Sequence, residues 1–381
     1  RAPAAFKKHH ALSACFMPYD SVMCAPMTFK VRIEPSGHEF TVAEQETVLE
    51  GALRHGYTLP YSCRNGSCGT CKGRLLTGDI DYGRYEDKAL SAAERAAGLA
   101  LFCQAVPRSD IVIQARELAA VAGITIKTLP ARVIKMERAA DDVMILSLKL
   151  PANQRLQFLA GQYLDILLKA NQRRSFSLAN PPHEDEFLQL HIRRVPDGLF
   201  TTHVFTQMKE KDLLRLRGPM GTFFLREDDV QGRTNAAGDR MSGAAPDRPV
   251  ILIGGGTGFA PIKGMLEHAF ARDISRPLHF YWGVRAKRDL YMHALPQAWA
   301  RTHANFRYTP VLSEPRAEDG WDGRTGWVHE AVLADYPDLS GHEVYASGPP
   351  PMIAAIKQAF FAHGLTPERL FFDSFEFAHP G

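Results

Sequence analysis

The sequence lacks three features that would assign it at once to a class of protein: a long apolar run, an excess of one charge and a dense set of cysteines. No apolar run approaches the roughly 20 residues that a membrane span requires, and even the run 249–254 ends in glycine. The formal net charge is only +3, which gives no reason to expect nucleic acid as a partner. The six cysteines are too few for a secreted disulfide scaffold of this length. We therefore expect a soluble, cytoplasmic protein without a membrane partner.

Length and local pattern divide the chain into three domains and two irregular segments. At roughly 100–200 residues per domain, 381 residues suggest two or three domains. The first 26 residues are basic, contain Asp20 as their sole acid and show no clean period, so we interpret them as an unstructured tail; a transit peptide is the alternative. We place the tail at 1–26, domains at 27–120, 125–228 and 249–381, and a flexible Gly- and Ala-rich insertion at 231–248.

Each domain has its own secondary-structure pattern. The first has two alternating strands, a helix that starts at Thr47 and stops at Gly56, and an irregular cysteine loop, so we expect a compact α+β domain. The second is a series of short strands with few helical periods, which favours an antiparallel barrel. The third alternates strands and helices, which favours a parallel α/β sheet. The strands expected in the last two domains are 131–136, 143–150, 163–168, 174–178, 187–193, 250–253, 279–282, 306–311 and 343–346, and the helices of the third begin near 259, 328 and 351.

Three cysteines in the first domain have the spacing C-x4-C-x2-C. They are Cys63, Cys68 and Cys71, and Cys103 follows later. This spacing is typical of plant-type [2Fe–2S] ferredoxins, in which four thiolates hold two irons. The glycines at 66 and 69 let the backbone pass close to inorganic sulfide. Zinc binding, disulfides and inert core cysteines are the competing interpretations, although zinc would favour paired C-x2-C units. We therefore predict an iron–sulfur cluster on Cys63, Cys68, Cys71 and Cys103.

Two short motifs in the second domain resemble the flavin-binding half of the ferredoxin–NADP reductase superfamily. They are Arg-Ser-Phe-Ser at 174–177 and Gly-Pro-Met-Gly at 218–221. The resemblance implies that the arginine pairs with the flavin pyrophosphate, the aromatic packs on the isoalloxazine and the second serine hydrogen-bonds near N5. Phe176 replaces the family's usual tyrosine and lacks its hydroxyl. Taken alone, the arginine would be a surface ion-pair residue and the phenylalanine a core residue.

The same resemblance places a second phosphate site at 197–202, which favours FAD over FMN. The flavin-binding residues that it implies are Arg174, Ser175, Phe176, Ser177, His191, Gly198, Leu199, Phe200, Thr201, Gly218, Gly221 and Thr222.

In the third domain, 251–261 runs from a buried strand through a glycine turn into a helix, which lets backbone amides approach a pyrophosphate, although it lacks the G-x-G-x-x-G spacing.

Residues 345–352 resemble the superfamily motif Cys-Gly-Pro-Pro-Pro-Met beside the nicotinamide, with serine in place of cysteine. The resemblance implies that the nicotinamide cofactor binds at Gly255, Gly256, Thr257, Gly258, Gly348 and Pro349. The segment 372–375 looks like the superfamily segment that lies against the flavin, and core packing is the alternative for its phenylalanines. The catalytic residues implied are Ser177, Ser347, Asp373 and Phe375, of which Phe375 also contacts cofactor.

The order of the three domains resembles reductase components of bacterial monooxygenases and dioxygenases, and CDP-6-deoxy-Δ3,4-glucoseen reductase-like proteins. It implies a β-grasp ferredoxin domain, a six-stranded flavin barrel and a nicotinamide domain in one NAD(P)H-dependent oxidoreductase. Electrons would pass from NAD(P)H through FAD and the cluster, one at a time, to a terminal acceptor protein, either an oxygenase component or a sugar dehydratase. We expect a monomer that prefers NADH. A non-catalytic redox sensor and an accessory subunit of a larger complex are the alternatives.

Two groups of charged residues have a functional and a plain interpretation. Arg285, Lys287 and Arg288 follow a strand of the third domain and would suit a 2′-phosphate, but such runs are more often solvated surface. The acids at 79, 81, 86 and 87 follow the cysteine loop and would suit a docking face, with solvated surface again the alternative.

Overall fold

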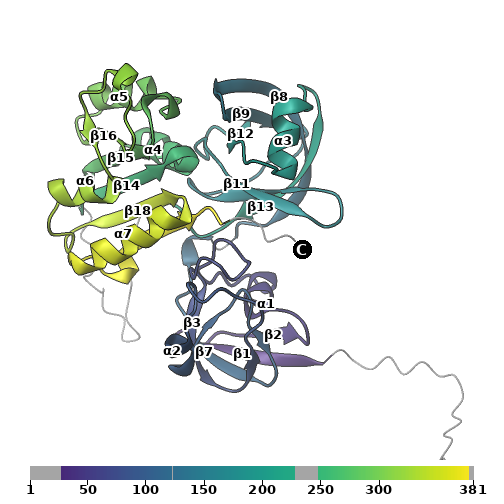
Figure 1. The fold of residues 1–381 in the computed structure, drawn as a ribbon. Helices are drawn as coiled ribbons and strands as arrows, with labels where there is room; N and C mark the ends of the chain where they lie inside the picture. The colour runs from purple at the N-terminus through teal and green to yellow at the C-terminus, as the bar shows by residue number, and fades with distance from the viewer. Residues whose placement is uncertain (1–26, 122, 228–247, 377–381) are drawn as a thin grey trace, which may run out of the picture.

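The computed structural model describes residues 27–121, 123–227 and 248–376 and arranges them as three domains (Figure 1). The domain with the cysteine loop lies below the other two in this view, and the barrel and the parallel sheet lie side by side above it. The predicted tail 1–26 lies outside the described residues, as does the predicted insertion except for Arg248. Within the described ranges, no helix has the length and apolar character needed to cross a bilayer.

The first domain is a five-stranded mixed sheet covered by helix α1, as its α+β pattern predicts. The strand order is β2-β1-β7-β3-β5, and the central pair β1 and β7 is parallel. Helix α1 begins after Thr47, whose side chain forms a capping box with Glu50, and the chain turns at Gly56 with φ +85°. The elements are β1 (Thr28–Glu34), β2 (Glu39–Ala43), α1 (Val48–Arg54), β3 (Lys72–Thr77), β4 (Ile80–Asp81), α2 (Ala92–Ala96), β5 (Leu99–Leu101), β6 (Val106–Pro107), β7 (Ile111–Gln114) and the 3-10 turn η1 (Ala119–Val121).

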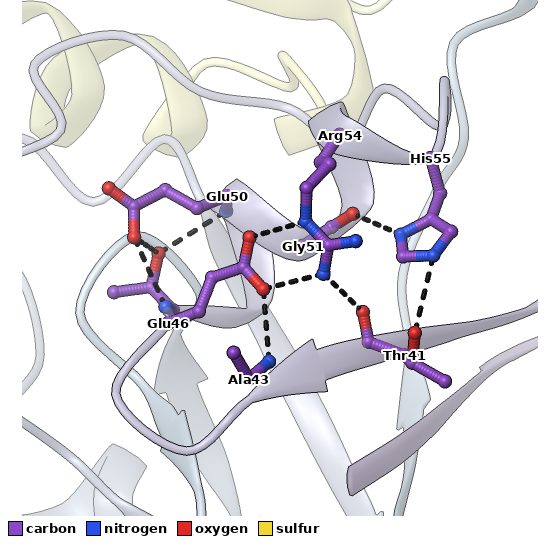
Figure 2. A network of polar contacts seen from close by, with 8 residues as sticks. Thr41, Ala43, Glu46, Glu50, Gly51, Arg54 and His55 are labelled. Carbon is purple, nitrogen blue, oxygen red and sulfur yellow. Dashed lines mark hydrogen bonds and ion pairs between the residues drawn. The ribbon is translucent and has the colours of Figure 1, made fainter. Parts of the chain in front are cut away.

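A polar network ties the end of α1 to strand β2 (Figure 2). Arg54 forms an ion pair with Glu46, with Nη2 2.7 Å from Oε2, and donates a hydrogen bond of 2.8 Å to the carbonyl of Thr41. The ring of His55 lies 2.9 Å from the carbonyl of Gly51 and 3.3 Å from the Thr41 hydroxyl. Exposed ion pairs stabilise only weakly, typically by about 0–1 kcal/mol, so the network mainly fixes the orientation of the helix.

The orientation of α1 matters because its first turn holds the segment of the fourth cysteine. The N–H groups of Val48 and Leu49 donate to the carbonyls of Ala105 and Phe102, each at 2.9 Å. These are helix N-terminal donors that have no partner within the helix. They therefore hold the backbone on either side of Cys103 in place.

The second domain is a six-stranded antiparallel barrel in the order β11-β10-β13-β8-β9-β12. A bridge between Leu178 and Leu190 joins β11 to β12 and closes it. Five strands match the sequence-based expectation within a few residues. The sixth, β13, contains Gly218-Pro219 near its end, which is a turn signal in sequence, and it was not expected. Helix α3 was also not expected. The elements are β8 (Lys127–Ala140), β9 (Val143–Lys149), β10 (Tyr163–Leu167), β11 (Arg173–Ser177), β12 (Leu188–Arg193), α3 (Leu199–Thr206) and β13 (Leu213–Met220).

The third domain is a parallel sheet in the order β17-β16-β15-β14-β18-β19 with helices on both faces. Helices α4 and α5 cover one core, and α6 and α7 cover the other. The order in which the strands are added reverses between β14 and β18, and ligands bind at such a switch point at the carboxyl ends of the strands. The elements are β14 (Val250–Gly255), η2 (Gly256–Gly258), α4 (Phe259–Ala271), β15 (Leu278–Val284), η3 (Lys287–Asp289), α5 (Ala294–Thr302), β16 (Phe306–Leu312), η4 (Ala317–Asp319), β17 (Arg324–Thr325), α6 (Val328–Asp335), β18 (Glu343–Gly348), α7 (Pro350–Ala362), η5 (Pro367–Arg369) and β19 (Leu370–Ser374).

Candidate functional site

The four predicted cluster cysteines are free and come together in two pairs. The thiol of Cys68 hydrogen-bonds to Cys63, and that of Cys71 hydrogen-bonds to Cys103. The bond from Cys68 lowers the pKa of Cys63 to about 7. The bond from Cys71 likewise lowers the pKa of Cys103, whereas donating these bonds and being buried raise the pKa values of Cys68 and Cys71. Three of the four thiols are buried, and Cys63 is partly exposed.

Two pairs of thiols suit a two-iron cluster. Among the described His, Cys, Asp and Glu side chains, no group of three converges as ligands of a single metal ion do. A structural zinc needs four such ligands around one centre, whereas a [2Fe–2S] cluster takes two thiolates at each iron. The pairing of the four thiols therefore fits the predicted cluster.

Backbone geometry explains the glycines of the cysteine loop. Gly66 has φ +82°, and a Cβ there would lie 2.6 Å from the carbonyl oxygen of Arg84. Gly69 has φ +78°, and its Cβ would lie 3.3 Å from the carbonyl oxygen of Ala89. The loop therefore takes a left-handed conformation while packed against the backbone of 84–89, which residues with side chains rarely adopt.

Strand β11 presents the first flavin motif with its side chains alternating between two faces. Phe176 packs on the barrel core with its ring 5.5 Å from that of Phe200. Arg174 lies on the same side and pairs with no acid of the described chain, its Nη1 donating to a backbone carbonyl at 2.8 Å. This leaves a cation and an aromatic ring beside each other, which suits a pyrophosphate and a flavin ring. Ser175 and Ser177 point the other way, toward Asp165 and Asp373 respectively.

Helix α3 supplies the predicted second-phosphate segment. Gly198 is its N-cap, and no side chain caps the helix, so its first-turn amides suit an anion. The Thr201 hydroxyl lies 3.1 Å from the amide of Val195, from which it accepts a hydrogen bond, so it stabilises the turn itself. Phe200 is buried beneath the helix, and Leu199 is exposed. The backbone amides of this segment therefore suit the expected phosphate site, whereas the Thr201 hydroxyl is already used within the turn.

The second flavin motif lies against the ferredoxin domain. Gly221 has φ +86°, and a Cβ there would lie 2.6 Å from the ring of Tyr163. Gly218 is similarly tight, with its Cβ 3.0 Å from Leu164. The Thr222 hydroxyl accepts from the amide of Tyr61 at 2.9 Å, and the Thr222 amide donates to the Tyr61 carbonyl at 3.1 Å. Thr222, expected to bind flavin, therefore joins two domains.

His191 lies between the barrel and the nicotinamide domain. Its ring nitrogens lie 2.8 Å from the Tyr291 hydroxyl and 3.2 Å from the Gln189 amide oxygen. Burial lowers its pKa to about 3, so the ring is neutral at physiological pH. The structure therefore places this expected cofactor residue at a domain interface with both nitrogens occupied.

The two nicotinamide motifs touch each other at the switch point of the parallel sheet. A Cβ at Gly258 would lie 1.9 Å from the carbonyl oxygen of Ser347, and one at Gly255 would lie 2.7 Å from Sδ of Met352. Helix α4 begins after Gly258 without a side-chain cap. The glycine turn 255–258 is therefore pressed against the start of α7, with helix amides facing the site.

Ser347 has the one buried hydroxyl in this turn that lacks a partner among the described residues. Its side chain is 0% exposed, and it lies opposite Gly254 on β14 and Asp373 on β19. An unpaired buried hydroxyl is costly unless a ligand supplies the partner. Its position beside both glycine motifs fits a bound nicotinamide ring.

Strand β19 brings Asp373 to the junction of the three domains. Its carboxylate accepts from the Ser62 hydroxyl at 2.7 Å and from the Ser177 hydroxyl at 3.3 Å. Burial raises the pKa of Asp373 to about 6, against the effect of the two hydrogen bonds. Phe375 follows, and its amide donates to the Gly348 carbonyl at 3.0 Å, which places it beside the nicotinamide motif.

Two residues that the sequence did not single out are of interest: Arg193 contacts the glycine turn, and Trp327 lies at the same edge of the sheet. Trp327 is 61% exposed at the carboxyl end of β17, the edge where a nucleotide binds. Nη1 of Arg193 would lie 2.6 Å from a Cβ at Gly256, and Asp142 holds its Nε at 2.7 Å. Their signals in sequence were weak, since a lone Trp before a helix and a basic pair after a strand are common.

Four of the seven charged residues with two interpretations have a partner for their side chain within the described part of the chain. Lys287 donates to the Asp319 carbonyl at 2.9 Å, and Arg285 lies 3.9 Å from Asp289. The acids after the cysteine loop include Asp81, which pairs with Arg108 at 2.8 Å. Glu86 pairs with Lys88 at 3.0 Å.

Comparisons with known proteins agree with this division of the chain. Residues 31–108 match the 2Fe-2S iron-sulfur cluster binding domain, 130–225 match the oxidoreductase FAD-binding domain and 252–358 match the oxidoreductase NAD-binding domain. The chain is 38% identical over 349 residues to the CDP-6-deoxy-L-threo-D-glycero-4-hexulose-3-dehydrase reductase of Yersinia pseudotuberculosis, covering 92% of this chain and 99% of that protein.

It is also 34% identical to reductase component 1 of terephthalate 1,2-dioxygenase from Comamonas sp, over 92% of this chain and 98% of that one. Among solved structures, the cytochrome P450 reductase GcoB of Amycolatopsis superposes with a TM-score of 0.73 and 35% identity, covering 91% of this chain and 99% of that one. The sequence-based predictions of fold, cofactors and enzyme class are thereby confirmed. The chain belongs to the family of NAD(P)H-dependent iron–sulfur flavoprotein reductases that join a [2Fe–2S], an FAD-binding and an NAD-binding domain.

Proposed function

We propose that this reductase takes electrons from NADH and delivers them singly to a separate acceptor protein. The observation that carries the proposal is the position of Asp373, on a strand of the nicotinamide domain, where it hydrogen-bonds both Ser62 beside the cluster cysteines and Ser177 of the flavin motif. All three cofactor sites therefore converge on one buried carboxylate. A ferredoxin-like domain that received electrons from another protein would not need this contact.

The residue roles follow from the geometry of the two cofactor sites. Arg174 and the first turn of α3 would bind the phosphates of FAD, and Phe176 would pack on its ring. The glycine turn 255–258 and the start of α4 would bind the pyrophosphate of NADH. The Ser347 hydroxyl would find its missing partner in the nicotinamide ring. When bound, the cofactors convert one hydride from NADH into two single electrons and one released proton.

Asp373 and Ser177 would handle a proton at the flavin ring. The Ser177 hydroxyl donates a hydrogen bond of 3.3 Å to the Asp373 carboxylate, and the pKa of this carboxyl is about 6, close to neutrality. A group with such a pKa can hold or release a proton near physiological pH. Phe375, with its amide bound to Gly348, would shield the ring from water.

The preference for NADH is supported by the contacts of two of the three cations that a 2′-phosphate would need, Lys287 and Arg285. Lys287 is held by a carbonyl of Asp319, and Arg285 lies near the carboxylate of Asp289. An additional phosphate would meet the negative charge of Asp289 beside Arg285. We therefore expect a lower KM for NADH than for NADPH.

The acceptor to test first is a dehydrase that acts on a CDP-linked deoxyhexulose, because the relative of this name is 38% identical over nearly its whole length. A terephthalate-type dioxygenase component is the second, at 34% identity. The chain is expected to act as a cytoplasmic monomer that meets its acceptor transiently. Gel filtration of the fully loaded protein would separate this from an accessory subunit, which would elute with its complex.

Reduction of cytochrome c under steady state tests the reductase activity itself. We expect turnover with NADH to exceed that with NADPH and to release about two reduced cytochromes per NADH. An anaerobic titration with NADH should bleach the flavin and then the cluster. A cluster that stays oxidised after the flavin is fully reduced would refute the proposed order, and absence of turnover would favour the redox-sensor alternative.

A further inference from the structure

The side chains of the two residues that flank the first cluster cysteine both leave the ferredoxin domain, that of Ser62 for the nicotinamide domain and that of Arg64 for the barrel. Ser62 donates to Oδ1 of Asp373 at 2.7 Å. Arg64, which has φ +58°, forms an ion pair with Asp165 and donates from Nε to the Tyr163 hydroxyl at 3.1 Å. Cys63 is therefore held on both sides by bonds that leave its own domain.

The same two acids hold the flavin strand. Asp165 accepts from Ser175 at 2.7 Å, and Asp373 accepts from Ser177 at 3.3 Å. Residues two apart on a strand share a face, so both serines of β11 point toward the acids. Each acid therefore links one residue beside Cys63 to one serine of the flavin motif.

Tyr163 joins the two hydrogen-bonded links, the one through Asp165 and the one through Asp373. Its hydroxyl donates to the Ser62 carbonyl at 2.6 Å and accepts from Arg64. On strand β10, Tyr163 lies opposite Ser177, and Asp165 lies opposite Ser175. The connection is thus built on neighbouring strands of a closed barrel, which is a rigid support.

Burial gives the network its strength. Asp165 is 1% exposed and Asp373 is 7% exposed, and both carboxylates have two or more partners. A fully paired polar network in a dry interface permits one arrangement of the groups that it joins, because any other arrangement leaves a buried charge unpaired. Domains of one chain otherwise move relative to each other.

We propose that Ser62, Arg64, Tyr163, Asp165 and Asp373 form a clamp that fixes Cys63 against the flavin strand and makes Cys63 the side of the cluster that receives electrons. Within the clamp they are positioning residues, since they act through Cys63 and β11, and this role of Asp373 is additional to the proton that it would hold at the flavin. Electron transfer slows exponentially with the distance between donor and acceptor. A clamp that prevents movement between the two domains therefore sets the rate of transfer from the flavin to the cluster. The inference rests on the proposed roles of Cys63 and β11.

The test removes single hydroxyls from the clamp in the fully loaded protein. Tyr163→Phe loses the bonds to Ser62 and Arg64 while keeping the ring, and Ser62→Ala is a second, smaller change if the first variant does not fold. Tyr281→Phe is the matched control, because that hydroxyl is also buried and donates at 2.6 Å to a carboxylate, Asp335, but lies within the nicotinamide domain.

Two measurements distinguish a clamp from general support of the fold. After rapid mixing with NADH, we expect reduction of the cluster to slow by roughly tenfold or more in both clamp variants, while reduction of the flavin stays within about twofold. Amide hydrogen exchange over 58–68 should become faster in both variants and stay unchanged in Tyr281→Phe.

Unchanged cluster reduction and exchange in the clamp variants would overturn the proposal, as would equal slowing of both steps or the same effect in the control. Electron paramagnetic resonance after dithionite reduction distinguishes failure of the clamp proposal from failure of the cluster assignment. Absence of a [2Fe–2S] signal in the parent protein would refute the assignment, whereas a normal signal with unchanged transfer would refute the clamp alone.

Discussion

Replacing Gly66 by alanine tests whether the backbone of the cysteine loop, beyond its four thiols, decides cluster binding. Gly66 has φ +82°, and a Cβ there would lie 2.6 Å from the carbonyl oxygen of Arg84 and 2.9 Å from Cα of Tyr85. Both neighbours are backbone atoms, which cannot rotate away as a side chain can. Gly37, in the turn between β1 and β2, has φ +75° with nothing within 4 Å of its Cβ position, so Gly37→Ala is the matched control.

The two variants separate the cost of the left-handed backbone from the cost of the steric overlap. A left-handed φ costs an alanine about 1–2 kcal/mol, and both variants incur this cost. Ordinary contact begins at 3.4 Å, so the loop around Gly66 must in addition move by several tenths of an ångström. Overpacking of this kind typically costs about 1–3 kcal/mol. We expect Gly66→Ala to destabilise the loaded domain by about 2–5 kcal/mol, against about 1–2 kcal/mol for the control.

The assay is the iron and sulfide content per chain, combined with thermal loss of the cluster's visible absorbance. Gly37→Ala should keep the full cluster and lose it at a slightly lower temperature than the parent. Gly66→Ala should be purified with much less iron, and what remains should be lost several degrees below the control. If Gly66→Ala carries the full cluster and loses it together with Gly37→Ala, the steric reasoning is wrong.

Three further predictions concern the flavin and nicotinamide sites. Trp327→Ala should raise the KM for NADH by roughly 2–10-fold with little change in kcat, since stacking contributes about 0.5–1.5 kcal/mol; an equal effect of Phe361→Ala, at another exposed aromatic, would contradict a specific role. Arg174→Met should weaken FAD binding by roughly 10–100-fold, measured as flavin fluorescence released on dilution, because a charge-assisted bond contributes about 1.5–3 kcal/mol; full retention of FAD would exclude the assignment. The pKa of Asp373 is raised from 3.8 to about 6, so the stability contributed is full below 3.8, falls as the pH rises from about 4 through 6 and is then lost, by up to about 3 kcal/mol at 1.36 kcal/mol per unit. Asp373→Asn should lack this loss when thermal unfolding of the cofactor-free protein is followed from pH 4 to 7, and parallel curves for the two proteins would show that Asp373 does not titrate in this range.

The local pattern of the chain was sufficient to predict most elements of the fold. Helix α1 begins after Thr47 because its capping box lies within four consecutive residues, and the central strand β14 of the parallel sheet is a continuous apolar run. Strand β13 was missed because Gly218-Pro219 is a turn signal in sequence, and only its pairing with β8 and β10 makes it a strand. Local signals fail where pairing with distant strands outweighs local preference.

The sequence by itself determined the cofactor classes, because cluster, flavin and nicotinamide motifs are short segments whose spacing already contains their chemistry. It did not determine how the three sites are joined. Ser62 and Asp373 are 311 residues apart in the chain, and Ser177 and Asp373 are 196 apart, so no spacing rule connects them. Only the packing of three domains places one carboxylate between the cysteine loop and the flavin strand, because a hydrogen bond depends on distance in space and not on separation along the chain.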